Sequence, residues 1–97
     1  MPLSAKVTTD HEVIERWVRD RGGHPASVKP VQENGGHGLL YIDFPNHPAR
    51  ELLTRTSWEE FFERFEQDRL AFLYQERTST GLTSRLFRIV SRERSYS

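Results

Sequence analysis

The segment Ser57–Tyr74 constrains the fold more than any other stretch, because its hydrophobic period changes partway along. Its first half carries aromatic side chains at the spacing of a single helix face: Trp58, Phe61, Phe62 and Phe65. Residues 70–74 then alternate as a strand does, with Leu70, Phe72 and Tyr74 on one side. Four of the six phenylalanines and one of the two tryptophans lie here. The segment is therefore predicted to be a helix followed by a strand, both facing the core.

Capping residues mark the start of two helices. Thr9 and Glu12 have the spacing of a capping box, and so do Ser57 and Glu60. The first helix is expected to end at Gly22 and Gly23, because one glycine can take the left-handed conformation there.

Four strands are predicted between and after the helices. Residues 39–44 and 70–74 alternate clearly, and residues 84–90 form the last strand. Residues 26–32 give a weak strand that Pro30 restricts to a sheet edge. Residues 33–38 and 76–83 are hairpin loops, and residues 45–56 are irregular with one helical turn at 49–53.

The predicted fold class is α+β with the order α-β-β-α-β-β. The simplest architecture is a four-stranded, mainly antiparallel sheet with both helices packed on one face. Each half reads as a capped helix, a strand, a loop and a strand, which suggests a structural duplication. Residues 9–92 are the expected domain, between a flexible lead at 1–8 and a polar tail at 93–97. The predicted core is Ile14, Trp17, Val18, Leu40, Ile42, Phe44, Trp58, Phe61, Phe62, Phe65, Leu70, Phe72 and Leu86 or Phe87.

Composition narrows the classes of function. The 97 residues suffice for one domain with one modest core. Fourteen basic and fourteen acidic side chains balance, which argues against binding nucleic acid or an anionic membrane by bulk charge. The chain has no cysteine, no apolar run of membrane-spanning length and no apolar leader of the signal-peptide type. A cytoplasmic protein is therefore expected.

The uncovered face of the predicted sheet is the first candidate for a partner surface. It would combine polar and apolar side chains, and a half-apolar open face is a common interaction surface. The candidate binding residues on this face and along the last strand are Tyr41, Asp43, Arg85, Phe87, Arg88 and Arg92. The expected partner is another protein or a second copy of the chain.

Charge is segregated between the second helix and the last strand. Acidic residues gather on the helix (Glu59, Glu60, Glu63, Glu66 and Asp68), and basic residues gather on the last hairpin and the tail (Arg77, Arg85, Arg88, Arg92 and Arg94). Three interpretations remain open. The two groups are ordinary solvated faces, or they join two copies as a homodimer. Alternatively, the arginines contact nucleic acid, with Phe87 or Tyr96 stacking on bases.

Signals for catalysis or metal binding are weak. His24, His37 and His47 fall in predicted loops without the spacing that presets two metal ligands on one element. No nucleophile elbow, phosphate-binding loop or dinucleotide fingerprint occurs. We therefore predict no catalytic residue, no metal and no cofactor. A small enzyme with a cleft formed by residues 45–56, His37 and His47 is the alternative. His11 is expected to have a surface role or to contact a neighbouring carboxylate.

Two groups of residues carry a family resemblance. They are the D-H-x-x-I-x-x-W and R-G-G-x-P-A-x-V patterns in residues 10–28, and S-W-E-E-F-F at residues 57–62. With these patterns the chain resembles a family of uncharacterised bacterial proteins of about this length, over residues 8–92. Some members are labelled 1,4-alpha-glucan branching enzyme, and the resemblance implies no catalytic residues.

The branching-enzyme label conflicts with the size of the chain. A branching enzyme of the amylase type needs a (β/α)₈ barrel of typically ~250 residues, with catalytic carboxylates presented from barrel strands. A chain of 97 residues cannot build that site. The prediction is therefore a non-catalytic binding or interaction module, with self-association, nucleic-acid binding and a small enzyme as alternatives.

Overall fold

The structure is a computed structural model that describes residues 5–28, 39–46, 48 and 50–92. The elements are β1 (Lys6–Thr8), α1 (His11–Asp20), β2 (His24–Val28), β3 (Leu39–Asp43), the 3₁₀ helix η1 (Arg50–Leu52), β4 (Leu53–Arg55), α2 (Trp58–Gln67), β5 (Leu70–Tyr74) and β6 (Phe87–Ser91). The α+β class is confirmed. Neither helix combines the length and apolar character that a membrane span requires in the described residues.

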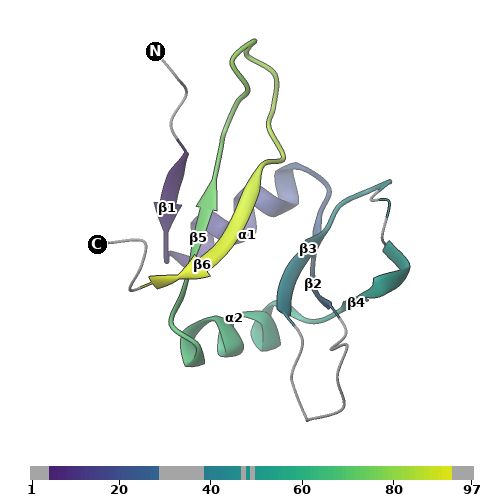
Figure 1. Cartoon of the computed structure of the whole chain (residues 1–97), viewed down its shortest axis with the longest axis vertical. Coiled ribbons are helices and arrows are strands. Elements are labelled where there is room, and N and C mark those ends of the chain that lie inside the picture. The colour runs from purple at the N-terminus through teal and green to yellow at the C-terminus, as the bar shows by residue number, and fades with distance from the viewer. Residues whose placement is uncertain (1–4, 29–38, 47, 49, 93–97) are drawn as a thin grey trace.

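The predicted single sheet of four strands is wrong. The described strands form two three-stranded antiparallel sheets: sheet A with the order β1-β5-β6, and sheet B with the order β3-β2-β4. In Figure 1, α1 lies behind sheet A and α2 runs beneath the space between the sheets. The two sheets share one core with both helices, because the buried cluster includes residues of α1, α2, β3 and β5.

Two three-residue strands explain the difference. Lys6–Thr8 falls in the predicted flexible lead but pairs with β5, and Leu53–Arg55 falls in the predicted irregular segment but pairs with β2. Segments this short carry too little alternation to identify a strand from sequence. The predicted helical turn at 49–53 appears as the short η1 at residues 50–52.

β2 is a central strand and not the predicted edge strand. It runs from His24 to Val28 and ends before Pro30, which lies outside the described residues together with the predicted loop at 33–38. β2 tolerates Pro25 because its carbonyl still accepts a hydrogen bond from the Thr56 N–H at 3.0 Å. The N–H group that proline lacks would point toward β4 just beyond the last paired residues of the two strands, so no hydrogen bond of that ladder is lost.

The predicted duplication is visible in the topology. Each half has the order β-α-β-β, and residues related by an addition of 47 play matching roles. Asp10 and Ser57 are both N-cap residues, and Gly22 and Arg69 both have positive φ, at 73° and 51°. The first strands are exchanged: β4 pairs with β2 of the first repeat, and β1 pairs with β5 of the second.

The N-cap of α1 is one residue later than predicted. Asp10, not Thr9, caps the helix by accepting a hydrogen bond from the Glu12 N–H at 2.9 Å. Aspartate also stabilises this end through its negative charge.

The other helix ends agree with prediction. The helix α1 ends in a Schellman motif, in which the N–H groups of Gly22 and Gly23 donate to the carbonyls of Arg19 and Val18. Ser57 caps α2 as predicted, by accepting from the Glu60 N–H at 3.0 Å.

The core lies between the two sheets and the two helices. Nine of the predicted core residues are buried: Ile14, Trp17, Val18, Leu40, Ile42, Phe44, Phe61, Phe65 and Phe72. Four others are half-buried and pack against these: Trp58, Phe62, Leu70 and Phe87. Leu86 is exposed, so Phe87 is the core residue of that pair. The core also takes in Tyr74, as the β5 alternation implies.

Candidate functional site

A groove lies between the third strands of the two repeats, β3 and β6, above the C-terminal part of α2. Its volume is about 650 Å³, within the range of ~300–1,000 Å³ that is usual for ligand sites. Most of its lining is apolar: Val28, Leu39, Leu40, Leu70, Phe87 and Ile89. Four polar side chains join the lining: Tyr41, Arg64, Asp68 and Arg88. The groove therefore offers an apolar surface with two positive charges and one negative charge.

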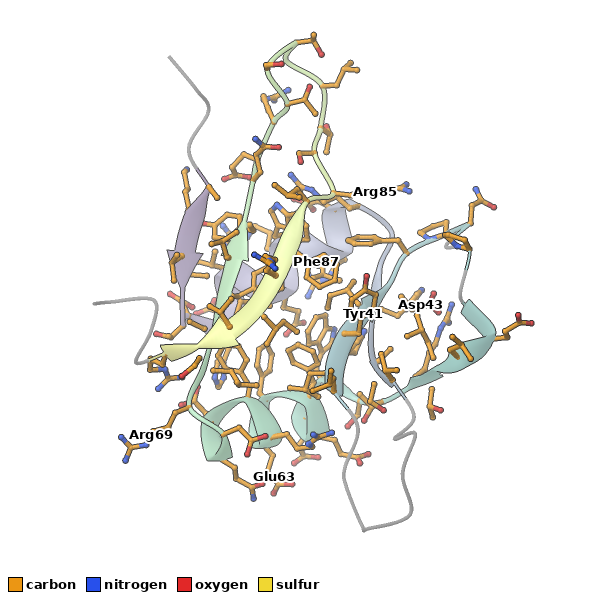
Figure 2. The ribbon with its side chains drawn as sticks, in the orientation of Figure 1. Tyr41, Asp43, Glu63, Arg69, Arg85 and Phe87 are labelled. Carbon is orange, nitrogen blue, oxygen red and sulfur yellow. The ribbon has the colours of Figure 1, made fainter. Side chains whose placement is uncertain are left out.

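The rings of Phe87 and Tyr41 are in contact at one end of the groove. Figure 2 shows both side chains between β6 and β3, and their ring centroids are 5.0 Å apart. The Phe87 ring also contacts the rings of Trp17, Phe44 and Phe72, at 5.8–6.3 Å. Phe87 therefore packs against the core and also lines the groove.

The edge of β6 beside the groove has outward-facing backbone groups. Hydrogen bonds from Gln75 N–H to Leu86 O and from Arg92 N–H to Arg69 O fix the alternation of the β5–β6 ladder. That alternation turns the N–H and C=O groups of Phe87 and Ile89 away from β5. In the described part of the chain, no turn or loop hydrogen bond uses these groups.

The edge of β3 is arranged in the matching way. The Pro25 carbonyl faces β4, so the neighbouring residues of β2 face β3 and pair with Leu39, Tyr41 and Asp43. The alternation leaves the backbone groups of Leu40 turned outward, toward the groove. The edge strands of both sheets therefore border the apolar groove.

The candidate residues on the predicted open face are separated by the fold. Asp43 is buried at 4% exposure, and its carboxylate accepts a hydrogen bond from Arg55 Nε at 3.0 Å. Arg85 is exposed, with its guanidinium 5.5 Å from the Phe44 ring centroid. Figure 2 places Asp43 and Arg85 to the side of the groove and above it, respectively. Of the six candidates, Tyr41, Phe87 and Arg88 line the groove together.

Arg92, which follows β6, joins this end of the strand to α2 and β5. It donates to the Leu70 carbonyl at 3.1 Å and to both carboxylate oxygens of Glu66 at 3.2 Å. His11 also binds this carboxylate, with Nε2 2.7 Å from Oε2, and its ring stacks on Phe62 at 4.0 Å. The predicted contact of His11 with a carboxylate is confirmed. The His11 hydrogen bond and, next, Arg92 lower the pKa of Glu66 below its usual value.

Arg21 anchors the hairpin between β5 and β6 to α1. Its side chain is 6% exposed, and its guanidinium lies over the Trp17 ring, 4.3 Å from the centroid. It donates to three backbone carbonyls, those of Trp17, Glu76 and Ser84. Burial lowers the pKa of Arg21, and the Glu76 and Asp20 carboxylates partly offset that effect. These hydrogen bonds fix the ends of the hairpin next to the start of β6, which forms one wall of the groove.

The outer face of sheet A is partly the open face that was predicted. Leu73 lies there, half-buried, and Val7 faces the same side at 37% exposure. Gln75 accepts a hydrogen bond from Ser84 Oγ at 2.7 Å. Phe87 and Ile89 face the core side instead, because they pair with Tyr74 and Phe72.

The structure describes only part of the predicted enzyme cleft. Among the described residues, no group of three or more His, Asp or Glu side chains could hold a metal ion. His24 is exposed, whereas His37 and His47 lie outside the described residues. From the predicted loop at 45–56, Thr56 lines a hollow of about 280 Å³ beside Glu60 and Glu63. The enzyme alternative depends on the two undescribed histidines and stays a prediction.

Several residues of the groove were missed by the sequence reasoning. Leu39 is 74% exposed on β3, and Ile89 and Arg64 belong to elements distant in sequence. The alternation of residues 39–44 already placed Leu39 beside Tyr41 and could have identified it. Arg64 carried no such signal, because its position under β3 depends on the division into two sheets.

Comparisons of the chain with protein-family models, with curated protein sequences and with solved structures found no match. The family resemblance of residues 8–92 therefore stays a prediction, and the function has to be argued from the groove itself.

Proposed function

We propose that this protein is a non-catalytic interaction module, and that the groove between β3 and β6 is its binding site. The observation that carries the proposal is the apolar lining of the groove beside charged side chains of both signs. Concave apolar sites with a few placed polar groups are the usual form of a binding site. Tyr41 and Arg88, two of the predicted binding residues, supply polar groups there.

The positions of Arg92 and Phe87 support this proposal over nucleic-acid binding. Arg92 is engaged by Glu66, and Phe87 is turned into the core instead of outward for base stacking. Nonspecific nucleic-acid binding needs several basic groups aligned along a backbone. Self-association between the acidic helix of one copy and the basic strand of another would need these charges. Arg92 and Glu66 already pair with each other within one chain, which disfavours that alternative.

A fluorescent apolar anion, anilinonaphthalene sulfonate, tests whether the groove binds ligands. Leu39→Asp is the informative variant, because Leu39 is 74% exposed and contributes little to the core. We expect the wild-type protein to bind the probe with backbone NMR shifts at Leu40 and Ile89. Leu39→Asp should weaken binding about tenfold, because it places a negative charge in an apolar site.

Leu82→Asp is the matched control. Leu82 is 68% exposed in the hairpin loop and does not line the groove, so the same substitution should leave probe binding unchanged. Thermal unfolding of both variants shows whether they remain folded. Equal loss in both variants, or NMR shifts located away from β3 and β6, would contradict the proposed site.

A further inference from the structure

We infer that the ligand of the groove is an extended segment of another protein, which adds a strand to the edge of β6. This inference rests on the proposed function and names the class of ligand. Apolar residues of the segment lie opposite Phe87 and Ile89, and an acidic residue lies opposite Arg88. The bound segment would extend sheet A by one strand.

The first support is the backbone of β6. The N–H and C=O groups of Phe87 and Ile89 face the groove, and an open strand edge is a template for pairing with another strand. A small apolar molecule in the groove would shield these groups from water without hydrogen-bonding them, which is unfavourable. A peptide strand supplies matching groups. The five residues of β6 correspond to about 17 Å of strand at ~3.4 Å per residue.

The second support is the alternation of side chains. In an antiparallel pair, directly opposite residues point to the same side of the sheet. Residues opposite Phe87 and Ile89 would therefore enter the apolar groove, and the residue between them would lie beside Arg88. Arg88 is exposed, and none of the ion pairs between described residues involves it. The expected pattern in the ligand is apolar–acidic–apolar.

The edge of β6 fits this role better than the edge of β3. Three consecutive residues of β6 line the groove, and two of them, Phe87 and Ile89, have outward backbone groups. On β3 only Leu40 combines both properties. A peptide paired with β6 therefore forms more backbone hydrogen bonds inside the groove.

A second copy of this chain is a poor occupant. Antiparallel pairing of β6 with β6 of another copy would bring two Arg88 side chains close together, and like charges opposite each other destabilise a sheet. The apolar–acidic–apolar pattern occurs in this sequence only at Ile42–Asp43–Phe44. All three of those residues are buried in the fold. The ligand is therefore expected to come from a different protein.

The experiment selects ligands from a displayed library of random ten-residue peptides against the full chain. Wild-type protein is the bait, and Leu39→Asp is used for counterselection. We expect enriched peptides to carry an acidic residue between two apolar ones. Arg88→Glu should weaken the best peptide about tenfold and favour a basic residue at the central position. Arg69→Glu makes the same charge change away from the groove (Figure 2) and should have no effect.

Two measurements show whether the bound peptide is a strand. N-methylation of the peptide residues opposite Phe87 and Ile89 should weaken binding at least about tenfold, whereas N-methylation of the intervening residue should be tolerated. Hydrogen exchange at the Phe87 and Ile89 amides should slow on binding. Protection confined to Leu40, or equal effects of all N-methyl positions, would overturn strand addition at β6.

The outcomes separate this inference from the proposed function. If the fluorescent anion binds in the groove but the library yields no groove-dependent peptide, the peptide inference is wrong and the binding site remains. If neither ligand binds, both proposals fail. Light scattering at low and high salt is measured on the same samples. A dimer that Arg88→Glu disrupts would show that the occupant of the groove is a second copy of the chain and not a peptide.

Discussion

Replacing Arg21 by methionine tests whether one buried cation holds the β5–β6 hairpin against α1. Methionine keeps an unbranched apolar stem of similar length, so the contact with Trp17 is partly retained. The guanidinium and its three hydrogen bonds to backbone carbonyls are lost. The carbonyls of Trp17 and Ser84 are the important partners, because both bonds are partly buried.

The expected loss follows from those two bonds. A hydrogen bond from a charged donor contributes about 1.5–3 kcal/mol, and an unpaired buried carbonyl costs about as much as the bond contributed. The desolvation of the guanidinium, which lowers the pKa of Arg21, is relieved on substitution and offsets part of the loss. We therefore expect the free energy of unfolding to fall by about 3 kcal/mol. A small domain has a total of ~5–10 kcal/mol, so the change is large.

Urea unfolding followed by far-ultraviolet circular dichroism measures this change. Arg77→Met is the matched control. Arg77 is exposed, and within the described part of the chain its side chain donates only to the Gly81 carbonyl, so a change within about 0.5 kcal/mol is expected. Arg21→Lys should recover less than half of the loss, because an ammonium cannot reach two carbonyls in fork geometry. If Arg21→Met and Arg77→Met unfold at the same urea concentration, the anchoring role is refuted.

Three further predictions concern the core, a close backbone approach and pH. Phe61→Ala should cost about 3–5 kcal/mol, because the ring is fully buried, and Phe62→Ala about half as much, because its ring is half-buried; urea titrations compare them directly. Gly23→Ala should cost about 1–3 kcal/mol, because the new methyl would lie 2.9 Å from atoms of two core side chains. The melting temperature of Gly23→Ala should fall clearly, and an unchanged value would show that the neighbouring core side chains can move to make room for the methyl group. Because the pKa of Glu66 is lowered in the folded state, its ionised carboxylate stabilises the fold above pH ~4.5, and this stabilisation is lost as the pH falls through the folded-state pKa. Glu66→Gln should therefore be less stable than wild type by less than about 1 kcal/mol at neutral pH, and the difference should vanish at acidic pH.

Local patterns predicted the helices well. Ser57 and the two glycines after α1 act through neighbours within one turn, so their roles could be read from spacing alone. The core residues could also be predicted from local patterns, because the hydrophobic period of each helix and strand shows which of its faces is buried. Thr9 was misassigned as a cap because Asp10, the next residue, competes for the same position.

Long-range pairing was where sequence reasoning failed. Nothing near Val7 indicates that it lies beside Leu73, and nothing near Thr54 indicates its place beside Ser27. Once these strands are known, the four predicted strands divide into two sheets. The groove forms at that division, so the role of Arg64 at its lining could not be anticipated.

The exchange of first strands has a consequence for how the molecule could be divided. Each β-α-β-β repeat completes the sheet of the other, so the chain resembles a strand-swapped dimer whose two subunits have been joined end to end. A cut between the repeats would leave each fragment holding the strand that the other fragment lacks. The joint between the repeats is therefore a natural place to split the protein into two complementary fragments, which would recover the fold only when they meet.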